Sequence, residues 1–212
     1  MIFINNNVMK IHKIKQGHRK LTEAKARIIG HLIGDGCVFQ SRTDYNIKYD
    51  NIDYELLNMF ISDFSEVYGL NGKIAYKPSG KTGKLRPFVR IRSIRAFKDL
   101  RRYCSYYSSE WEVPKQILNS KKVIKKEFLM ALFDDEGSVI PKGRKAIVRL
   151  YSINMSGLKQ VQELLSSFKI NSKIVSGFGS KRNVFAITIK NIEQFQQKIN
   201  FYCLRKKEKL EK

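Results

Sequence analysis

Three acidic residues stand side by side in a chain that is otherwise strongly basic. Asp134, Asp135 and Glu136 follow an apolar run and precede a glycine in the stretch ALFDDEGSV (131–139), whereas the whole chain carries 41 Lys and Arg against 19 Asp and Glu. Carboxylate oxygens are the ligands that hard divalent cations prefer. Such a cluster in so basic a chain predicts a metal site.

A second acid occupies the matching place in the first half of the chain. Asp35 lies 101 residues before Glu136, and each is followed by a glycine at the predicted end of an apolar helix. The carbonyl end of a helix carries partial negative charge, so a carboxylate there is unfavourable unless a cation is present. One acid–glycine pair can simply mark a solvated helix end, but two pairs at matched positions favour a shared metal site.

The helices and strands that must position these acids follow one order in both halves: helix, two strands, helix, two strands, helix. In the first half, where Thr22 caps the first helix, the predicted elements span 21–36, 37–40, 45–50, 52–69, 72–78, 86–93 and 93–103. In the second half they span 123–137, 138–142, 145–153, 155–168, 172–178, 183–190 and 191–199. Repetition at a lag of about one hundred residues indicates an internal duplication.

The duplication divides the chain into four parts. We expect a basic N-terminal arm (1–20), a first repeat (21–106), a linker (107–122) that contains Pro114, and a second repeat (123–212). Packing the two acid-ended helices against each other brings Asp35 and Glu136 to one end of the pair.

Small residues on the first helix permit that packing. Gly30 and Gly34 are four apart, so they share a face and let another backbone approach closely. The alignment of the strands 45–50 and 145–153 between the two repeats is uncertain by one residue. If Tyr49 is matched with Tyr151, Lys48 and Arg149 fall on opposite strand faces.

The two stretches IIGHLIGDG (28–36) and LMALFDDEG (129–137) resemble the paired signature motifs of the LAGLIDADG homing endonucleases, in their two-motif, single-chain form. The resemblance covers nearly the whole chain from Leu21. It implies a mixed α+β fold of two pseudo-symmetric αββαββα repeats. Their antiparallel sheets would form a DNA-binding saddle, with the motif helices packed at the interface.

The same resemblance implies an activity and its residues. Asp35 and Glu136 would be metal ligands and catalytic acids, supported by the carbonyl groups of Gly34 and Asp135. Lys206, in the run LRKKEKL (204–210), would be a catalytic lysine of the active site, although a solvated charge run is the competing interpretation of that segment. Mg²⁺ would be the cofactor, with Mn²⁺ as a substitute and Ca²⁺ binding without cleavage. The reaction would be double-strand cleavage at a long asymmetric site, leaving 3′ overhangs. Asp135 departs from the family pattern, which has a small residue there.

Alternating strand residues supply candidate DNA contacts, because alternation places the bases on one face of each sheet. Solvated strand faces of a basic protein are the competing interpretation. The candidates on strands and loop tips are Arg90, Arg92, Lys142, Arg144, Lys145, Arg149, Tyr151, Lys73, Lys77 and Arg182. Asn51 and Asn154, each just before a helix, either position water or cap the helix. We expect His31 to be a packed or surface residue.

Composition limits the classes of partner. Residues 1–110 hold 20 basic and 10 acidic residues and residues 111–212 hold 21 and 9, so both halves suit a polyanion such as nucleic acid, with an anionic membrane surface as the competitor. No apolar run reaches the roughly 20 residues of a spanning helix, and the start is too short for a signal peptide. Three separate cysteines without a CxxC pair favour an intracellular, reducing setting.

Other functions remain as alternatives. The same fold could serve an RNA-splicing maturase, with intron RNA as a partner, or a sequence-specific DNA-binding protein; retention of both acids favours cleavage. An unrelated basic nucleic-acid or ribosome-associated protein is a further alternative. An intein is disfavoured because the chain lacks a Cys or Ser start and a His-Asn end. We expect a monomer that acts on double-stranded DNA, at a target the sequence does not specify.

Overall fold

The structure, a computed structural model, describes residues 15–80, 83–142, 145–180 and 182–211. The first half contains α1 (Glu23–Ile33), β1 (Gly36–Ser41), β2 (Asp44–Asp50), α2 (Tyr54–Tyr68), β3 (Ile74–Pro78), β4 (Leu85–Arg92) and α3 (Ile94–Leu100). The second half contains α5 (Lys122–Glu136), β5 (Gly137–Lys142), β6 (Lys145–Ser152), α6 (Met155–Ser167), β7 (Ser172–Phe178), β8 (Val184–Ile189) and α7 (Ile192–Lys198). The predicted mixed α+β class and the repeated αββαββα order are confirmed.

Two further helices lie outside the repeated order. The short α4 (Lys115–Leu118) precedes α5, and α8 (Leu204–Leu210) follows α7. The sequence LRKKEKL suggested a solvated charge run, but it forms α8, in which Lys206 and Leu210 are buried. In the described part of the chain no helix is long and apolar enough to cross a membrane.

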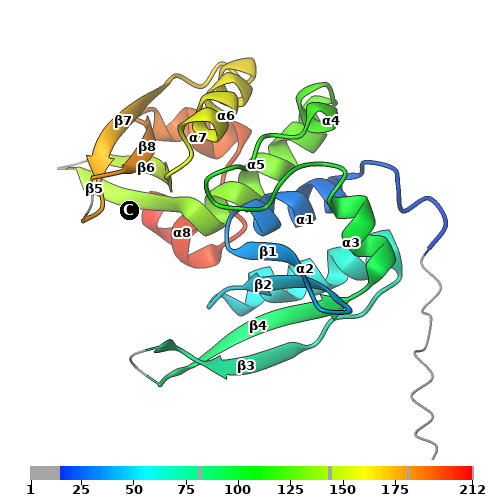
Figure 1. Cartoon of the computed structure of the whole chain (residues 1–212). Helices are drawn as coiled ribbons and strands as arrows, with labels where there is room; N and C mark the ends of the chain where they lie inside the picture. Colours follow the sequence, from blue (N-terminus) through cyan, green and yellow to red (C-terminus); the bar gives the residue numbers. More distant parts are fainter. Residues whose placement is uncertain (1–14, 81–82, 143–144, 181, 212) are drawn as a thin grey trace, which may run out of the picture.

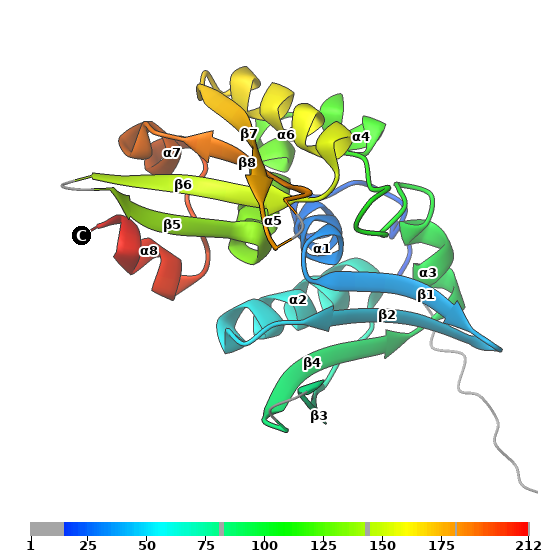
Figure 2. The same ribbon diagram turned by 60° about the vertical axis from the view of Figure 1, so that its left-hand side comes forward.

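Each half builds one four-stranded antiparallel sheet, with strand orders β1-β2-β4-β3 and β5-β6-β8-β7. The two sheets stand on either side of α1 and α5, which lie side by side in the middle (Figures 1 and 2). Apolar residues of the strands alternate towards the helices: Val89 and Ile91 are buried, whereas Arg90 and Arg92 are exposed.

The strand pairing resolves the register that the sequence left open. Gly36 pairs with Tyr49 in the first half, and Gly137 pairs with Leu150 in the second. The counterpart of Tyr49 is therefore Leu150, and the match with Tyr151 was wrong by one residue. With the corrected register Lys48 and Arg149 hold equivalent positions, opposite Cys37 and Ser138 respectively.

The two motif helices approach closely because small residues line their contact. A Cβ atom added at Gly30 would lie 2.7 Å from the Phe128 carbonyl oxygen and 2.8 Å from the Ala131 Cβ. One added at Gly34 would lie 2.5 Å from the Asp135 Cβ. Asp135 thus fits opposite a glycine, and the helices pack tightly despite its size.

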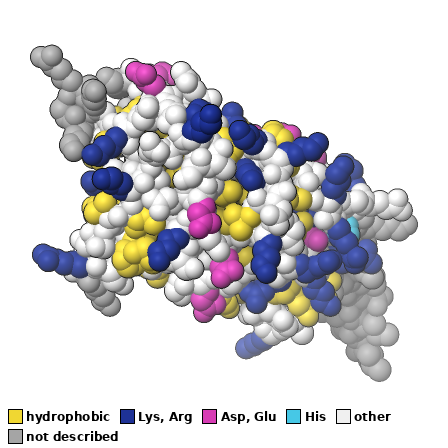
Figure 3. Space-filling view, turned by 90° about the horizontal axis from the view of Figure 1, so that it is seen from above, with side chains coloured by type: hydrophobic (Ala, Val, Ile, Leu, Met, Phe, Trp, Pro, Cys, Tyr) yellow, Lys and Arg dark blue, Asp and Glu magenta, His cyan; other side chains and the backbone are white. Residues whose placement is uncertain are grey.

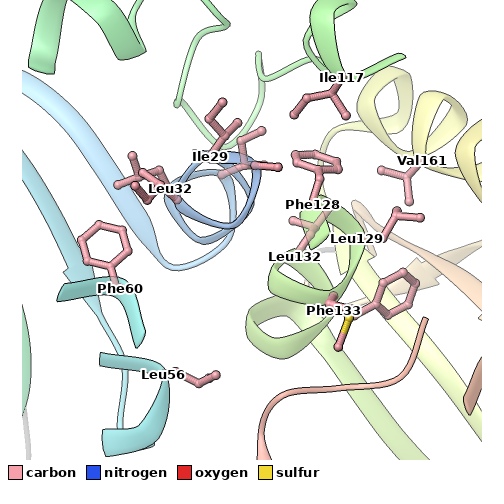
Figure 4. Close-up of a cluster of buried hydrophobic side chains, with 14 of the residues drawn as sticks. Ile29, Leu32, Leu56, Phe60, Ile117, Phe128, Leu129, Leu132, Phe133 and Val161 are labelled. Atoms are coloured by element: carbon pink, nitrogen blue, oxygen red, sulfur yellow. The ribbon is translucent and has the colours of Figure 1, made fainter. Parts of the chain in front are cut away.

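Apolar side chains continue this contact into both halves (Figure 4). Ile29 and Leu32 of α1 and Phe128 and Leu132 of α5 are almost completely buried. A charged link crosses the same interface: the Arg27 guanidinium donates to Asp63 on α2 (2.6 and 2.9 Å) and to Glu127 on α5 (2.8 Å). The two acid-ended helices are therefore fixed in register at both ends of their contact.

Candidate active site

Asp35 and Glu136 lie at the matching ends of the two packed helices. Asp35 follows Gly34, the C-cap residue of α1, and Glu136 is the last residue of α5. Burial and the Asp135 carboxylate raise the pKa of Asp35 to about 7, although solvent reaches its side chain from one side. Burial and the Asp35 carboxylate raise the pKa of Glu136 to about 8. The acids therefore repel each other, and a cation between them would relieve that repulsion.

Asp135 does not point towards solvent but reaches across the helix interface into the first half. Its buried carboxylate accepts hydrogen bonds from the Tyr49 hydroxyl (2.7 Å) and the Asn51 amide (3.0 Å), and pairs with His31 Nδ1 at 3.0 Å. The Asn51 amide also lies 3.5 Å from Asp35 Oδ2. Asn51 thus connects the buried carboxylate to one of the two site acids. We call these four residues, His31, Tyr49, Asn51 and Asp135, the cross-interface network.

His31 is completely buried within this network. Burial opposes its protonation, but the neighbouring carboxylates, led by Asp135, raise its pKa above the ordinary value. Its Nε2 atom has no hydrogen-bond partner among the described residues. The expectation of a packed or surface residue was therefore incomplete, because His31 forms a buried ion pair with the second half.

Asp134 holds the C-terminal segment against α5. Its carboxylate accepts hydrogen bonds from the backbone N–H groups of Tyr202 (3.0 Å) and Cys203 (2.9 Å). Burial raises the pKa of Asp134 to about 6. The role of this acid is structural, since the segment that it fixes leads directly into α8.

That segment delivers Lys206 to the end of α5. Its ammonium group donates to the carbonyl oxygens of Phe133 (3.2 Å), Asp134 and Asp135 (3.4 Å). Burial lowers the pKa of Lys206, and the carboxylates of Asp135 and Asp134 oppose that shift. The structure therefore places the predicted lysine beside the site, with its charge directed at the negative end of the helix.

A cavity of about 250 Å³ opens beside these groups. It is lined by Asp35, Asp50, Asn51, Ile52, Asp53, Arg86, Pro87, Asp134, Asp135, Arg205 and Lys206. Asp53 is paired with Arg205 at 2.8 Å, and Asp50 lies between Lys48 and Lys77. Among the described residues, Asp35 is thus the lining acid that has neither an ion pair nor a hydrogen bond from a backbone N–H group to its carboxylate.

Comparison with known proteins agrees with the fold. Residues 124–200 match the family described as a LAGLIDADG-like domain. The homing endonuclease I-WcaI bound to its DNA recognition sequence superposes with a TM-score of 0.66 at 18% identity, covering 90% of this chain and 87% of that one. I-DmoI in complex with DNA and Mn gives 0.63 at 16% identity, covering 85% and 98%. The chain therefore shares the fold of these homing endonucleases, and its second half matches a LAGLIDADG-like domain.

Proteins of other names also match the chain. Full-length DUF199/WhiA from Thermatoga maritima matches with a TM-score of 0.60 at 15% identity, over 93% of this chain and 60% of that one. Among curated proteins, a DNA gyrase of Mycobacterium gordonae is 27% identical over 152 residues, which is 70% of this chain and 27% of the gyrase polypeptide. A DNA polymerase of Acanthamoeba polyphaga mimivirus is 31% identical over 56% of this chain and 7% of its own length. The chain spans about a quarter or less of these two relatives.

The basic residues that the sequence singled out on the first sheet lie on its outward face or in its loops. Arg90 and Arg92 are exposed on β4, with Arg92 3.7 Å from Asp44. Lys77 pairs with Asp50 at 2.6 Å. Lys73 is exposed in the loop before β3. Several of these cations are therefore partly neutralised by neighbouring acids.

On both sheets a cation lies over an aromatic ring: Arg90 lies 5.7 Å from the ring centre of Phe88 on the first sheet, and Arg149 contacts Phe178 on the second. The Arg149 guanidinium lies 4.9 Å from the ring centre of Phe178, and Tyr151 meets the same ring edge-on at 5.4 Å. Arg149 Nε has no hydrogen-bond partner among the described residues. Arg182 is exposed in the turn after β7. Arg144 and the side chains of Lys142 and Lys145 lie outside the described part of the chain.

Sequence reasoning missed the cross-interface network. Of its two interpretations of Asn154, water positioning or helix capping, the structure shows the second. Asn154 is the buried N-cap of α6: it accepts from the Gly157 N–H (3.0 Å) and donates to the Trp111 carbonyl (2.5 Å). A signal for the network existed in the repeat. His31 in the first motif helix corresponds to Leu132 in the second, because the two positions are 101 residues apart. A polar residue where the other copy has an apolar one indicates a role that only one half has.

Proposed function

We propose that this chain is a site-specific double-strand DNA endonuclease that depends on a divalent metal. The observation that carries the proposal is the pair Asp35 and Glu136, held at matching ends of two packed helices, each with a pKa raised above its ordinary value by burial and neighbouring carboxylates. A protein that only binds DNA gains nothing from this arrangement, since two acids near two helix C-termini oppose both folding and phosphate binding.

The acids fit a hard divalent cation. Carboxylate and carbonyl oxygens are its usual ligands, so Asp35, Glu136 and the carbonyl groups of Gly34 and Asp135 would hold Mg²⁺. Lys206, 3.4 Å from the Asp135 carbonyl, shares that oxygen. The metal, when bound, supplies an activated water and stabilises the leaving 3′ oxygen. We expect Mn²⁺ to substitute and Ca²⁺ to support binding without cleavage.

Residues of the chain position the reacting groups. Asn51 fixes the Asp35 carboxylate, and Lys206 places positive charge beside the phosphate to be cut. The outward faces of the two sheets hold the duplex in its grooves as one monomer, across repeats 21–106 and 123–212. The contacts assigned to DNA are Arg90, Arg92, Lys142, Arg144, Lys145, Arg149, Tyr151, Lys73, Lys77 and Arg182. Cleavage of both strands would leave 3′ overhangs at a long asymmetric target, inside the cell.

A second candidate is a maturase or a DNA-binding protein of the same fold without cleavage. The shared fold of the DUF199/WhiA protein favours keeping it, because one fold can host several functions. The two site acids, intact here, weigh against it.

Digestion of a randomised duplex library tests the proposal. With Mg²⁺ we expect discrete double-strand ends that converge on one sequence, and with Ca²⁺ we expect retention of the same sequence without new ends. Selective retention without cutting in Mg²⁺ or Mn²⁺ would reject the nuclease and support the second candidate.

A further inference from the structure

A basic hollow lies far from the paired acids, between the segment 15–20 and α3. Its volume is about 380 Å³, and it is lined by His18, Arg19, Arg95, Lys98, Asp99 and Arg102. Figure 3 shows Lys and Arg side chains gathered beside a histidine at the right-hand side of the view. We call this group of residues the α3 hollow.

The cations of the α3 hollow have no acids to pair with. Arg95, Lys98 and Arg102 follow one another at spacings of three and four, so they share one side, where like charges destabilise. All three are exposed, as is Arg19. In the part of the chain that the structure describes, none of the four forms an ion pair.

The acid in the hollow is already neutralised from within. Asp99 is buried and accepts from the Lys25 ammonium (2.6 Å) and the Tyr68 hydroxyl (2.9 Å). Lys25 is completely buried, so this pair faces the core. Asp99 therefore does not neutralise the four exposed cations, and these can bind an external anion.

Hydrogen bonds to α1, to the end of α2 and to the turn after α3 hold the segment 15–20 in place beside the hollow. The Lys15 N–H donates to the Tyr68 carbonyl (3.2 Å), the Lys25 ammonium donates to the His18 carbonyl, and the Tyr103 hydroxyl lies 3.4 Å from the Arg19 carbonyl. These backbone contacts place Arg19 next to the cations of α3. The folded protein thus holds Arg19 close to the cations of α3 despite the repulsion between their like charges.

The α3 hollow lies on the opposite side of the first sheet from the proposed duplex. Tyr45 of β2 packs edge-on against Phe97 of α3, with ring centres 5.1 Å apart. Tyr45 alternates in step with buried Ile47 and Tyr49, so α3 covers the inner face, whereas Lys48 belongs to the outer face. A stiff duplex lying along the outer face does not reach the hollow.

We propose that the α3 hollow binds the phosphodiester backbone of a second, single-stranded nucleic-acid segment. Guanidinium groups bind phosphate through paired, charge-assisted hydrogen bonds. Arg95 and Lys98 lie on α3 and Arg102 lies in the turn that follows it, so the cations are spread along the hollow, which suits successive phosphates rather than one ion. A volume of about 380 Å³ accommodates one backbone but not the width of a duplex. Only the placement of the duplex on the sheets rests on the proposed function.

Binding of labelled oligonucleotides to matched triple variants tests this site. One variant removes the cations of the hollow (Arg95→Gln, Lys98→Gln, Arg102→Gln), and a second removes those of the sheets (Arg90→Gln, Arg92→Gln, Arg149→Gln). A control removes three exposed lysines elsewhere (Lys115→Gln, Lys121→Gln, Lys122→Gln). The probes are oligouridine RNA, oligothymidine DNA and a duplex, each titrated at several salt concentrations.

We expect the hollow and sheet variants each to weaken the binding of one class of probe only. The hollow variant should weaken single-strand binding by about tenfold or more and lower its salt slope by ~2, at ~0.7 per lost phosphate contact, with duplex binding nearly unchanged. The sheet variant should do the reverse, and the difference between the RNA and DNA probes identifies the source of the strand. Equal losses for hollow and control variants, or equal losses on single strand and duplex, would overturn the site. Because no cleavage is measured, an inactive nuclease would leave this test valid.

Discussion

The ends of the two motif helices share their acids but differ in what surrounds them. At the constant lag of 101 residues, the first half has His31, Gly34, Tyr49 and Asn51 where the second has Leu132, Asp135, Leu150 and Ser152. An acid at the end of a motif helix is thus present in both halves, whereas the polar hydrogen-bond donors that support it are present in the first half only. That support crosses the interface, because the first half supplies the donors and the second supplies the carboxylate.

One pair in this comparison shows how the difference arose at a single position. Asn51 Oδ1 accepts from the Asp53 N–H (3.0 Å), and Ser152 Oγ accepts from the Asn154 N–H (3.1 Å). Both side chains therefore hold the same turn before a helix. The longer Asn51 also reaches the acids, and the serine is too short to do so. Both repeats therefore have the same turn, but only the copy in the first half also contacts the acids.

The largest effect should come from breaking the buried ion pair. His31→Leu copies the second half and leaves the Asp135 carboxylate buried without its cation, which should lower the free energy of unfolding by about 3 kcal/mol. Chemical denaturation of the variant against the wild type measures the loss. The control is His31→Leu with Asp135→Ala, which removes both partners and should recover part of the loss. If the double variant is less stable than His31→Leu, the pair is not what stabilises the interface.

A smaller effect, on catalysis alone, should follow from Asn51→Ser. Serine keeps the turn, as Ser152 does, but withdraws the amide from Asp35 and Asp135, so one acid loses its positioning. We expect one strand to be cut about tenfold more slowly at saturating DNA, with binding unchanged. Strand-resolved nicking of the recovered target measures it, with Ser152→Ala as the matched control. Equal slowing of both strands by the two variants would show that the halves are supported alike.

The smallest effect should be a pH dependence of the metal-free protein. The pKa of Asp35 is raised to about 7 and that of Glu136 to about 8, so the folded protein holds these protons more tightly than the unfolded chain. Stability should therefore fall as pH rises from about 4 towards 8. Since solvent reaches Asp35, we expect only about 3 °C in Tm, or ~1 kcal/mol for a chain of this size.

Thermal unfolding of the metal-free protein across this pH range, in the presence of a chelator, tests whether stability falls as the pH rises. Asp35→Asn combined with Glu136→Gln should flatten the fall and make the variant the more stable protein at pH 8. Added Mg²⁺ should stabilise the wild type more at pH 8 than at pH 6. A wild type that gains stability through this range relative to the double variant would contradict the repulsion between the acids.

Periodicity and duplication were enough to predict the two repeats, the order of helices and strands along each of them, and the equivalent positions of Asp35 and Glu136 at the helix ends. The cross-interface network could not be predicted, since His31 and Asp135 are 104 residues apart and their contact depends on how the helices rotate against each other. The burial of Lys206 was hidden for another reason. A run of lysines indicates solvent, and only the exposed carbonyl groups at the end of α5 make one of them stable inside.

Single-turnover cleavage by proteins with one acid replaced tests the central claim, that Asp35 and Glu136 form one metal-dependent centre. With Mg²⁺ and the recovered target, Asp35→Asn and Glu136→Gln should each abolish double-strand cleavage, with loss of ~10²-fold or more in rate, while binding in Ca²⁺ persists. Cleavage of both strands at the wild-type rate by either variant would contradict the account.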